Sequence, residues 1–578
     1  MKYKILAILC LCFILWFTIQ PVEQNWCGTD ILLSEVTSGI AIVAVLILVW
    51  RKQQMSLSAI DIVVALWFAY VMFRSYVDST YPCANFVLRI MQMVALYGCI
   101  RLLLSSAQIS ERIIVVAILL CGIYEVFLGA EQLINGGSRH YLFLISGSFL
   151  NPGPYSIFLS MGLVMSCQFR KNYHSSNTIL TSLFSWLPLV FFILLPATWS
   201  RAAILSAVIC LGIIFWDQWK RYRWYVFGGL CLIFLGLYFL KQGSADGRSI
   251  IYMISLLSIC HTPVFGSGIG SFCHQYAEEM ANFSMQHPTF NFQSADVIDG
   301  AFNSILQIGV EQGLVGVGFA VVLVVLMFAR LVKCGKTLGI GGLCLLIFSM
   351  FSYPFDQLPY QIIFVMTVAF SATGRTEVAP FTRWYHLPKI CLTPTVTLGC
   401  ILLLSGFTYM QIMKRAKAES DYKMIAGQRN AAFLSDYYKL RPLLLSNKQF
   451  LFDFSKTLSR NGRYADSNAI LRQGALISND PMFYVIQGNN YCEMGFNHEA
   501  EQAYKKAFDA MPNRLYPLYQ LMLLYEKDGN EEKMADMAYR VLCFDEKVVS
   551  PATKEMKRIA NRKCKSIITK KEVAENLK

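Results

Sequence analysis

Three arginines in this sequence stand beside glycine, serine or asparagine, in stretches that interrupt long apolar segments. They are Arg139 in NGGSRHYLFLISGSFLNPGPYSIFL, Arg201 in ATWSRAAILSAVI and Arg248 in DGRSIIYM. An arginine near the end of a membrane helix can simply extend into the lipid headgroups. Three of them on one side of a membrane favour a shared anionic ligand instead. The planar guanidinium suits phosphate oxygens, so a pyrophosphate at the membrane surface is the expected ligand.

The longest polar stretch, residues 241–300, is where chemistry is expected. It contains HTPVFGSGIGSF and ends in DVIDGA, just before FNSILQIGVEQGLVG. The glycine-rich GSGIGS has no following Lys-Ser/Thr and no preceding strand, so it predicts a turn back into the membrane rather than a nucleotide site. Glu311 and Gln312, followed by Gly313, are expected to end one helical element and begin the next.

The composition predicts that the surrounding elements are membrane helices. Of 578 residues, 55% are hydrophobic and 15% are charged, and the mean hydropathy is +0.45. Apolar runs long enough to cross a hydrocarbon core of ~30 Å recur along the first part of the chain. They begin at Ile5 and continue at 31–50, 58–73, 84–104, 113–134, 142–168, 178–198, 202–216, 224–240, 301–329, 338–352, 360–373 and 389–413. An all-α, polytopic fold with about 12–13 transmembrane helices is expected over residues 1–413.

Lysine and arginine set the expected orientation, because positively charged loops stay in the cytoplasm. They cluster in alternate loops, at Lys2 and Lys4, Arg51 and Lys52, Arg112, Arg170 and Lys171, Lys220 to Arg223, Arg330 to Lys336, and Arg375 to Lys389. Residues 241–300, and everything after Met413, are therefore expected on the outer side. MKYK before the first apolar run also fits a secretory signal peptide, but no small-residue cleavage site follows cleanly, which favours an uncleaved helix.

Residues 414–578 read as a separate, soluble helical domain. Within it, PMFYVIQGNNYCEMGFNHEAEQAYKKAFDAMPN has the spacing of a tetratricopeptide unit at Tyr484, Gly488, Tyr491, Ala500, Tyr504, Ala507 and Pro512. Weaker copies flank it and align on Gly462, Gly495 and Gly529. Such an array binds or positions a protein partner, and no catalytic constellation is seen in it. The net charge of +14 follows mainly from topology, and no basic surface interleaved with aromatics predicts a nucleic-acid partner.

The order of motifs in the membrane part resembles the superfamily of O-antigen ligases and polymerases. SGSFLNPGPYSIFL, which contains Asn151, is similar to the family's Gly-x-Phe-x-Asn-Pro segment. The Ser200-Arg201 pair opens a helix, Arg248 precedes a stretch like the family's Pro-x-x-Gly-x-Gly, and FNSILQIGVEQGLVGVG matches its Asn-x-x-Leu and Glu-x-Gly elements from Asn303 onward. The resemblance covers roughly residues 140–320, and tetratricopeptide repeats also occur behind the membrane domain in this superfamily.

This resemblance implies an enzyme of lipopolysaccharide or polysaccharide biosynthesis in a bacterial inner membrane, with a periplasmic C-terminal domain. The donor would be a glycan on a polyprenyl pyrophosphate, and the acceptor a hydroxyl on a lipid, a glycan or a protein. Arg201 and Arg248 would hold the pyrophosphate and stabilise its departure. Arg139, Asn151 and Asn303 would contribute to substrate binding. Neither a metal nor another cofactor is expected, because the arginines supply the positive charge.

One position departs from the family pattern. Members carry a histidine just before the motif asparagine, whereas this chain has Phe302. Asp299 is the leading substitute as the group that deprotonates the acceptor, and Asp296, His274 and His287 lie in the same outer segment.

Several alternatives stay open. A ligase, a polymerase and a protein O-oligosaccharyltransferase differ in their acceptor, which the sequence does not identify. The missing histidine also fits a non-catalytic membrane scaffold whose repeats recruit envelope partners. A transporter could place arginines in the same way, but the two halves show no inverted repeat.

Overall fold

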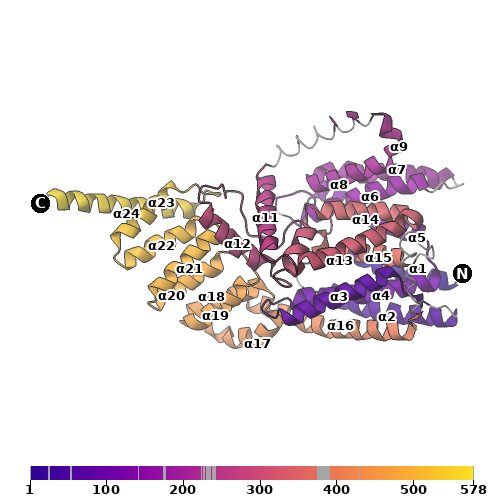
Figure 1. The fold of residues 1–578 in the computed structure, drawn as a ribbon, viewed down its shortest axis with the longest axis horizontal. Helices are drawn as coiled ribbons and strands as arrows, with labels where there is room; N and C mark the ends of the chain where they lie inside the picture. The colour runs from indigo at the N-terminus through magenta and orange to yellow at the C-terminus, as the bar shows by residue number, and fades with distance from the viewer. Residues whose placement is uncertain are drawn as a thin grey trace.

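A computed structural model describes residues 2–23, 26–51, 55–140, 142–172, 178–222, 224–225, 228–229, 236, 242–373, 391–392, 394–428 and 430–576. In it, helices of the first part of the chain form a bundle, and the C-terminal helices extend from one end of that bundle (Figure 1). The two-residue strands β1 (Met55–Ser56) and β2 (Cys391–Leu392) pair antiparallel. The expected span 224–240 falls largely outside the described residues.

The bundle contains long helices and shorter apolar ones. They are α1 (Lys2–Trp16), α2 (Gly28–Trp50), α3 (Ala59–Val77), α4 (Ala84–Ala107), α5 (Glu111–Asn135), α6 (Pro152–Asn172), α7 (Thr178–Leu194), α8 (Arg201–Ile214), α9 (Trp216–Trp219), α13 (Ser304–Cys334), α14 (Lys336–Ser349), α15 (Leu358–Ala372) and α16 (Pro394–Ile425), with short 3-10 turns η1 (Phe17–Ile19), η2 (Pro196–Thr198), η3 (Lys220–Tyr222) and η4 (Pro354–Asp356).

Seven segments among the described residues are long and apolar enough to cross a membrane. They are Lys2–Ile19, Gly28–Trp50, Ala59–Val77, Ala84–Ala107, Glu111–Asn135, Ser304–Cys334 and Pro394–Ile425. Four shorter apolar helices accompany them, at Ser185–Thr198, Arg201–Ile214, Lys336–Ser349 and Leu358–Ala372. These helices support a multi-pass membrane protein, and the count of 12–13 spans stays a prediction.

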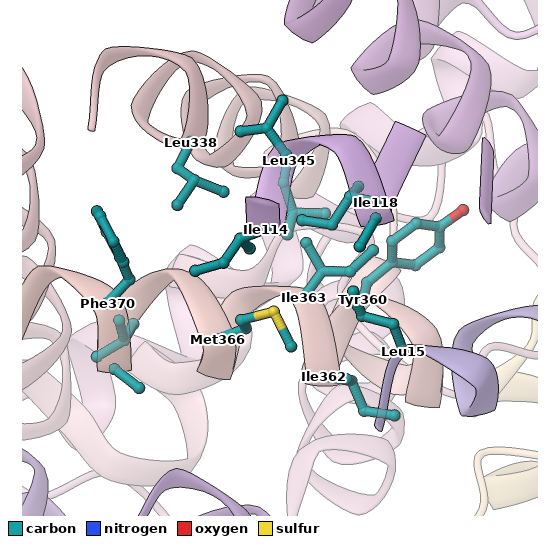
Figure 2. Packing of buried hydrophobic residues seen from close by; sticks show 14 of the residues in the cluster. Leu15, Ile114, Ile118, Leu338, Leu345, Tyr360, Ile362, Ile363, Met366 and Phe370 are labelled. Carbon is teal, nitrogen blue, oxygen red and sulfur yellow. The ribbon is translucent and has the colours of Figure 1, made fainter. Parts of the chain in front are cut away.

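The bundle is held together by α15, which is shorter than a full span and lies at its centre. Figure 2 shows Tyr360, Ile363 and Met366 of α15 among side chains from α1, α5 and α14. Ile114, Ile118, Leu338 and Leu345 meet them there and are all buried. The first helix also packs against α4 and α5, so α1 is an integral part of the bundle.

One expected span begins later than predicted. The apolar run 142–168 was expected to be helical throughout, but α6 starts only at Pro152. The preceding residues form a loop whose backbone amides donate hydrogen bonds to two side chains of α5. Glu125 accepts hydrogen bonds from the Ser148 amide at 3.1 Å and hydroxyl at 2.6 Å, and Gln132 accepts from the amides of Ser146 and Gly147. Proline supplies the fixed φ of a first helical position, which explains the start of α6.

The polar outer segment forms two helices, α11 (Gln242–His261) and α12 (Phe272–Gln286). Both lie between the bundle and the C-terminal helices in Figure 1. The C-terminal helices are η5 (Ala431–Phe433), α17 (Leu434–Leu444), α18 (Lys448–Arg460), α19 (Tyr464–Ala475), α20 (Met482–Glu493), α21 (Asn497–Ala510), α22 (Leu515–Lys527), α23 (Glu531–Cys543) and α24 (Pro551–Asn576).

The C-terminal helices pack in consecutive pairs, α18 with α19, α20 with α21, and α22 with α23. Gly462, Gly495 and Gly529 stand at the turn within each pair, with φ of 74°, 79° and 70°. Gly488 lies against Tyr504, and a Cβ there would come within 2.4 Å of the ring. The motif glycines thus permit a left-handed turn or a close helix approach. Assignment to the tetratricopeptide class, and a domain boundary at residue 413, stay predictions.

The long helix α13 is broken at Gly313, as its sequence predicts. Gly313 has φ 66° and ψ −166° inside the helix. Backbone atoms of the turn after α11 fill the break, because the amides of Leu314 and Val315 donate to the carbonyls of Pro263 and Val264 at 2.8 and 3.2 Å. The glycine-rich stretch therefore packs against a helix break.

Replacing Gly313 by alanine is expected to destabilise the protein by about 3 kcal/mol or more. The new Cβ would lie 2.3 Å from the Val264 carbonyl oxygen, in a backbone conformation that only glycine adopts readily. Thermal unfolding of the purified protein measures this. Gly318→Ala in the same helix is the matched control, because nothing lies within 4 Å of its added Cβ. Equal melting temperatures for the two variants would contradict the steric argument.

Candidate functional site

Arg201 and Arg248 come from different helices and act on each other electrostatically. Arg201 is the first residue of α8, which is capped by Ser200, and Arg248 lies in the second turn of α11. Burial lowers the pKa of Arg248, and the positive charge of Arg201 lowers it further. Tyr252 and Tyr353 act in the opposite direction and raise it. Both guanidinium groups are half-buried. The positive charge of Arg201 therefore acts on Arg248 from a different helix.

Phe302, at the position of the family histidine, packs directly on this site. Its ring centroid lies 5.7 Å from the guanidinium carbon of Arg248. The ring of Tyr353 contacts it edge-on, with 5.3 Å between the two ring centroids. Its φ of 50° is left-handed, which is rare for an aromatic residue. The Tyr252 hydroxyl donates to the Phe302 carbonyl at 3.3 Å and to that of Met350 at 2.9 Å. The chain thus holds an unfavourable backbone conformation beside Arg248.

A carboxylate that the sequence analysis missed belongs to the same cluster. Asp356 ends η4 between α14 and α15 and lines a cavity of 180 Å³. Burial, and then the negative charge of Asp299, raises the pKa of Asp356 to about 6. The pKa of Tyr353 is raised by burial and by Asp356, and lowered by Arg248, so both charges act on Tyr353. The only sequence signal was a lone acidic residue, in FSYPFDQLPY, between two expected spans on the outer side.

Asp356 is surrounded by many protein atoms, and the open part of its surface faces the cavity. Among the described residues, no hydrogen bond or ion pair to its carboxylate is found. A carboxylate in this position is available to a ligand in the cavity.

The other predicted binding residues have structural contacts of their own. Arg139 is exposed and donates to the Ser148 carbonyl at 2.7 Å, within its own loop. The Asn151 side-chain oxygen accepts from the second residue of α6 at 2.9 Å. Asn303 caps α13, its oxygen accepting two backbone amides at 3.0 and 3.1 Å. Each residue shapes the backbone next to a motif.

Asp299, the predicted base, lies at the boundary with the C-terminal helices. It is 76% exposed and forms an ion pair with Lys448 of α18. Asp296 pairs with Arg514 at 3.2 Å and with Lys547 at 3.0 Å. Asp296 and Asp299 therefore both join this segment to the C-terminal part of the chain.

His274 and His287, the two histidines named above as candidate bases, are likewise engaged in structural contacts. The His274 Nδ1 lies 3.1 Å from the Ala475 carbonyl oxygen of α19, and the His287 Nδ1 lies 3.2 Å from the Phe283 carbonyl oxygen of its own helix. Neither contact brings an imidazole to the arginines.

Reversing the charge of Asp296 is expected to loosen the outer segment from the C-terminal helices. Exposed ion pairs contribute up to about 1 kcal/mol each, so Asp296→Lys should raise hydrogen exchange in residues 287–300 about tenfold. Hydrogen-exchange mass spectrometry of the full chain measures it. Asp466→Lys is the control, since Asp466 pairs with Arg463 within one helix region. Unchanged exchange in the Asp296 variant would show that the two ion pairs do not hold the segment.

One part of the chain matches a known protein family. Residues 186–321 match a family model described as O-Antigen ligase. The matched range includes Arg201, Arg248, Asp299, Phe302 and Asn303, and excludes Arg139, Asn151 and Asp356. No curated protein matches the chain. The match and the apolar helices together support a multi-pass membrane protein whose residues 186–321 are similar to the O-antigen ligase family.

Proposed function

We propose that this protein transfers a glycan from a polyprenyl pyrophosphate to an acceptor hydroxyl at the outer face of a bacterial inner membrane. The observation that carries the proposal is that two motif arginines, Arg201 and Arg248, lie within the residues matched to the O-antigen ligase family and that the charge of Arg201 acts on Arg248. Two cations and one available carboxylate are the groups that such a transfer needs. The C-terminal helices would then lie in the periplasm.

In the proposed reaction, the acceptor oxygen attacks the anomeric carbon of the donor sugar. The bond from that carbon to the pyrophosphate oxygen breaks, and the pyrophosphate leaves with the electron pair, inverting the anomeric centre. Arg201 and Arg248 bind the pyrophosphate and stabilise the charge that grows on it. Because they are half-buried, their attraction to an anion is less screened than at an open surface.

We assign the role of general base to Asp356 in place of Asp299. A base must be free to take the acceptor proton, and its pKa should lie near the working pH. Asp356 has a pKa of about 6 and faces a cavity. Asp299 is exposed and pairs with Lys448, so its proposed contribution is electrostatic and structural. Arg139, Asn151 and Asn303 are proposed to hold the backbone around the donor.

Phe302 offers a direct test of this assignment. Histidine is commoner than phenylalanine in left-handed backbone, so Phe302→His should fold. If Asp356 is the base, restoring the family histidine should change transfer less than tenfold. A missing base would instead be compensated by a gain of about 10²-fold or more. Glycan transfer by Phe302→His, with Phe302→Leu as a control that lacks a titratable group, distinguishes these two cases.

The test of the proposed function is a glycan profile of cell envelopes from a strain lacking this gene. Lipid-linked, polymerised and protein-bound sugars are resolved separately. A shift in one pool that the wild-type gene restores supports the transferase, and that pool identifies the acceptor. An unchanged profile favours the scaffold, with the paired C-terminal helices as its partner-binding part.

A further inference from the structure

The cavity that Asp356 lines has no assigned ligand. It measures 180 Å³ and is formed by three parts of the chain that are distant in sequence. One wall comes from residues 17–23 and 26–30, at the end of α1 and the start of α2. A second comes from Asn85 and Arg89 of α4, and the third from Asp356, Leu358 and Pro359. The cavity therefore includes Asp356, the carboxylate assigned above as the general base.

One wall of the cavity is a rigid polar network. The Arg89 guanidinium donates to Asp30 at 2.7 Å and to Gln92 at 2.8 Å, and it lies over the Trp26 ring at 4.5 Å. Asp30 is buried and also accepts the Cys27 amide at 3.1 Å. Because these contacts fix Arg89 and Asp30 before any ligand arrives, the wall is preorganised for binding.

Two other carboxylates facing the cavity have no such partners. Within the described residues, no hydrogen bond or ion pair is found for the side chain of Glu23 or of Asp356. Both can accept hydrogen bonds from hydroxyl groups of a ligand. Phe17, Pro21 and Pro359 supply apolar surface to the same cavity.

This combination matches the chemistry of a sugar ring. A pyranose presents hydroxyl groups around its rim and apolar C–H groups on its faces. The cavity offers acceptors and fixed donors together with apolar side chains, in a volume close to that of one ring.

We propose that this cavity binds a single sugar ring of the acceptor, with one hydroxyl directed at Asp356. This inference rests on the proposed function and narrows it, because the acceptor would then be a glycan or glycolipid. Glu23 and Arg89 bind the hydroxyl groups of the ring that do not react. Asp356 takes the proton from the reacting hydroxyl.

The test uses the full-length protein in lipid nanodiscs, titrated with free hexoses and N-acetylhexosamines by saturation-transfer-difference NMR. Two variants alter the cavity without touching Asp356: Glu23→Leu removes an acceptor, and Thr29→Phe fills space. Each is expected to weaken binding of the preferred sugar about tenfold or more. Glu131→Leu is the matched control, an exposed carboxylate of α5 outside the cavity. Thermal unfolding checks that each variant is folded.

Transfer assays on the same variants separate this proposal from the proposed function. If Arg248→Ala abolishes transfer while Glu23→Leu and Thr29→Phe leave both sugar binding and transfer unchanged, the sugar site is wrong and the transferase stands. If the preferred sugar binds and only the cavity variants lose it, the site is supported, even where Arg248→Ala retains transfer and the proposed mechanism fails. Absence of binding by every sugar in the panel overturns the site.

Discussion

Arg248→Ala is expected to lower glycan transfer by about 10²-fold or more, because it removes a half-buried cation from the departing pyrophosphate. Arg248→Lys keeps the charge but loses the planar fork, and should recover only part of the rate. The measurement is restoration of the affected envelope glycan in the deletion strain, together with transfer by purified protein. Since Arg248 also contacts Phe302, a melting curve for each variant separates lost chemistry from lost folding.

Arg472→Ala is the matched control for this experiment. Arg472 is exposed on α19, so its loss removes one arginine without altering the proposed site. Full restoration by Arg248→Ala, at normal protein levels, would refute the role of the arginines and favour the scaffold.

Asp356→Asn is expected to have opposite effects on transfer and on stability. Transfer should fall by about 10²-fold or more, because the amide cannot accept the acceptor proton. In the wild type, transfer should decline as the pH falls below about 6, where Asp356 becomes protonated. Asp299→Asn should lose less than tenfold under the same assay. A larger loss in the Asp299 variant would return the base assignment to Asp299.

The stability effect follows from the raised pKa of Asp356. The unfolded chain releases this proton near pH 4, whereas the folded protein holds it until about pH 6. The ionised carboxylate therefore destabilises the folded state as the pH rises through this window, and the effect is complete above it. Asp356→Asn should melt higher than the wild type at pH 8, and the difference should shrink toward pH 4.5. A lower melting temperature at pH 8 would show that the carboxylate has a stabilising partner.

Much of the local structure follows from the sequence. Apolar runs predicted most helices of the bundle, since length and hydropathy decide which segments can cross a membrane. The break at Gly313 and the turns at the repeat glycines were also predictable, because glycine alone adopts such backbone freely. The prediction that a helix begins at residue 142 was wrong, because Glu125 and Gln132 bind a loop there and hydropathy gives no information on such contacts.

The candidate site could be predicted only in part. Arg201 and Arg248 stood out because arginine is costly beside apolar helices, and each has polar neighbours in the sequence. Their proximity, the packing of Phe302 on Arg248 and the pairing of Asp299 with Lys448 depend on contacts between distant segments. No local pattern encodes such contacts.

By itself, the sequence determined a helical membrane protein with a polar segment between its apolar helices and paired C-terminal helices, because hydropathy and glycine spacing act over a few neighbouring residues. Only the tertiary structure decided which carboxylate is available. Asp299 and Asp356 are chemically identical, but folding pairs one with a lysine at the surface and leaves the other facing a cavity. Burial and partners, rather than residue type, set the basicity of a carboxylate.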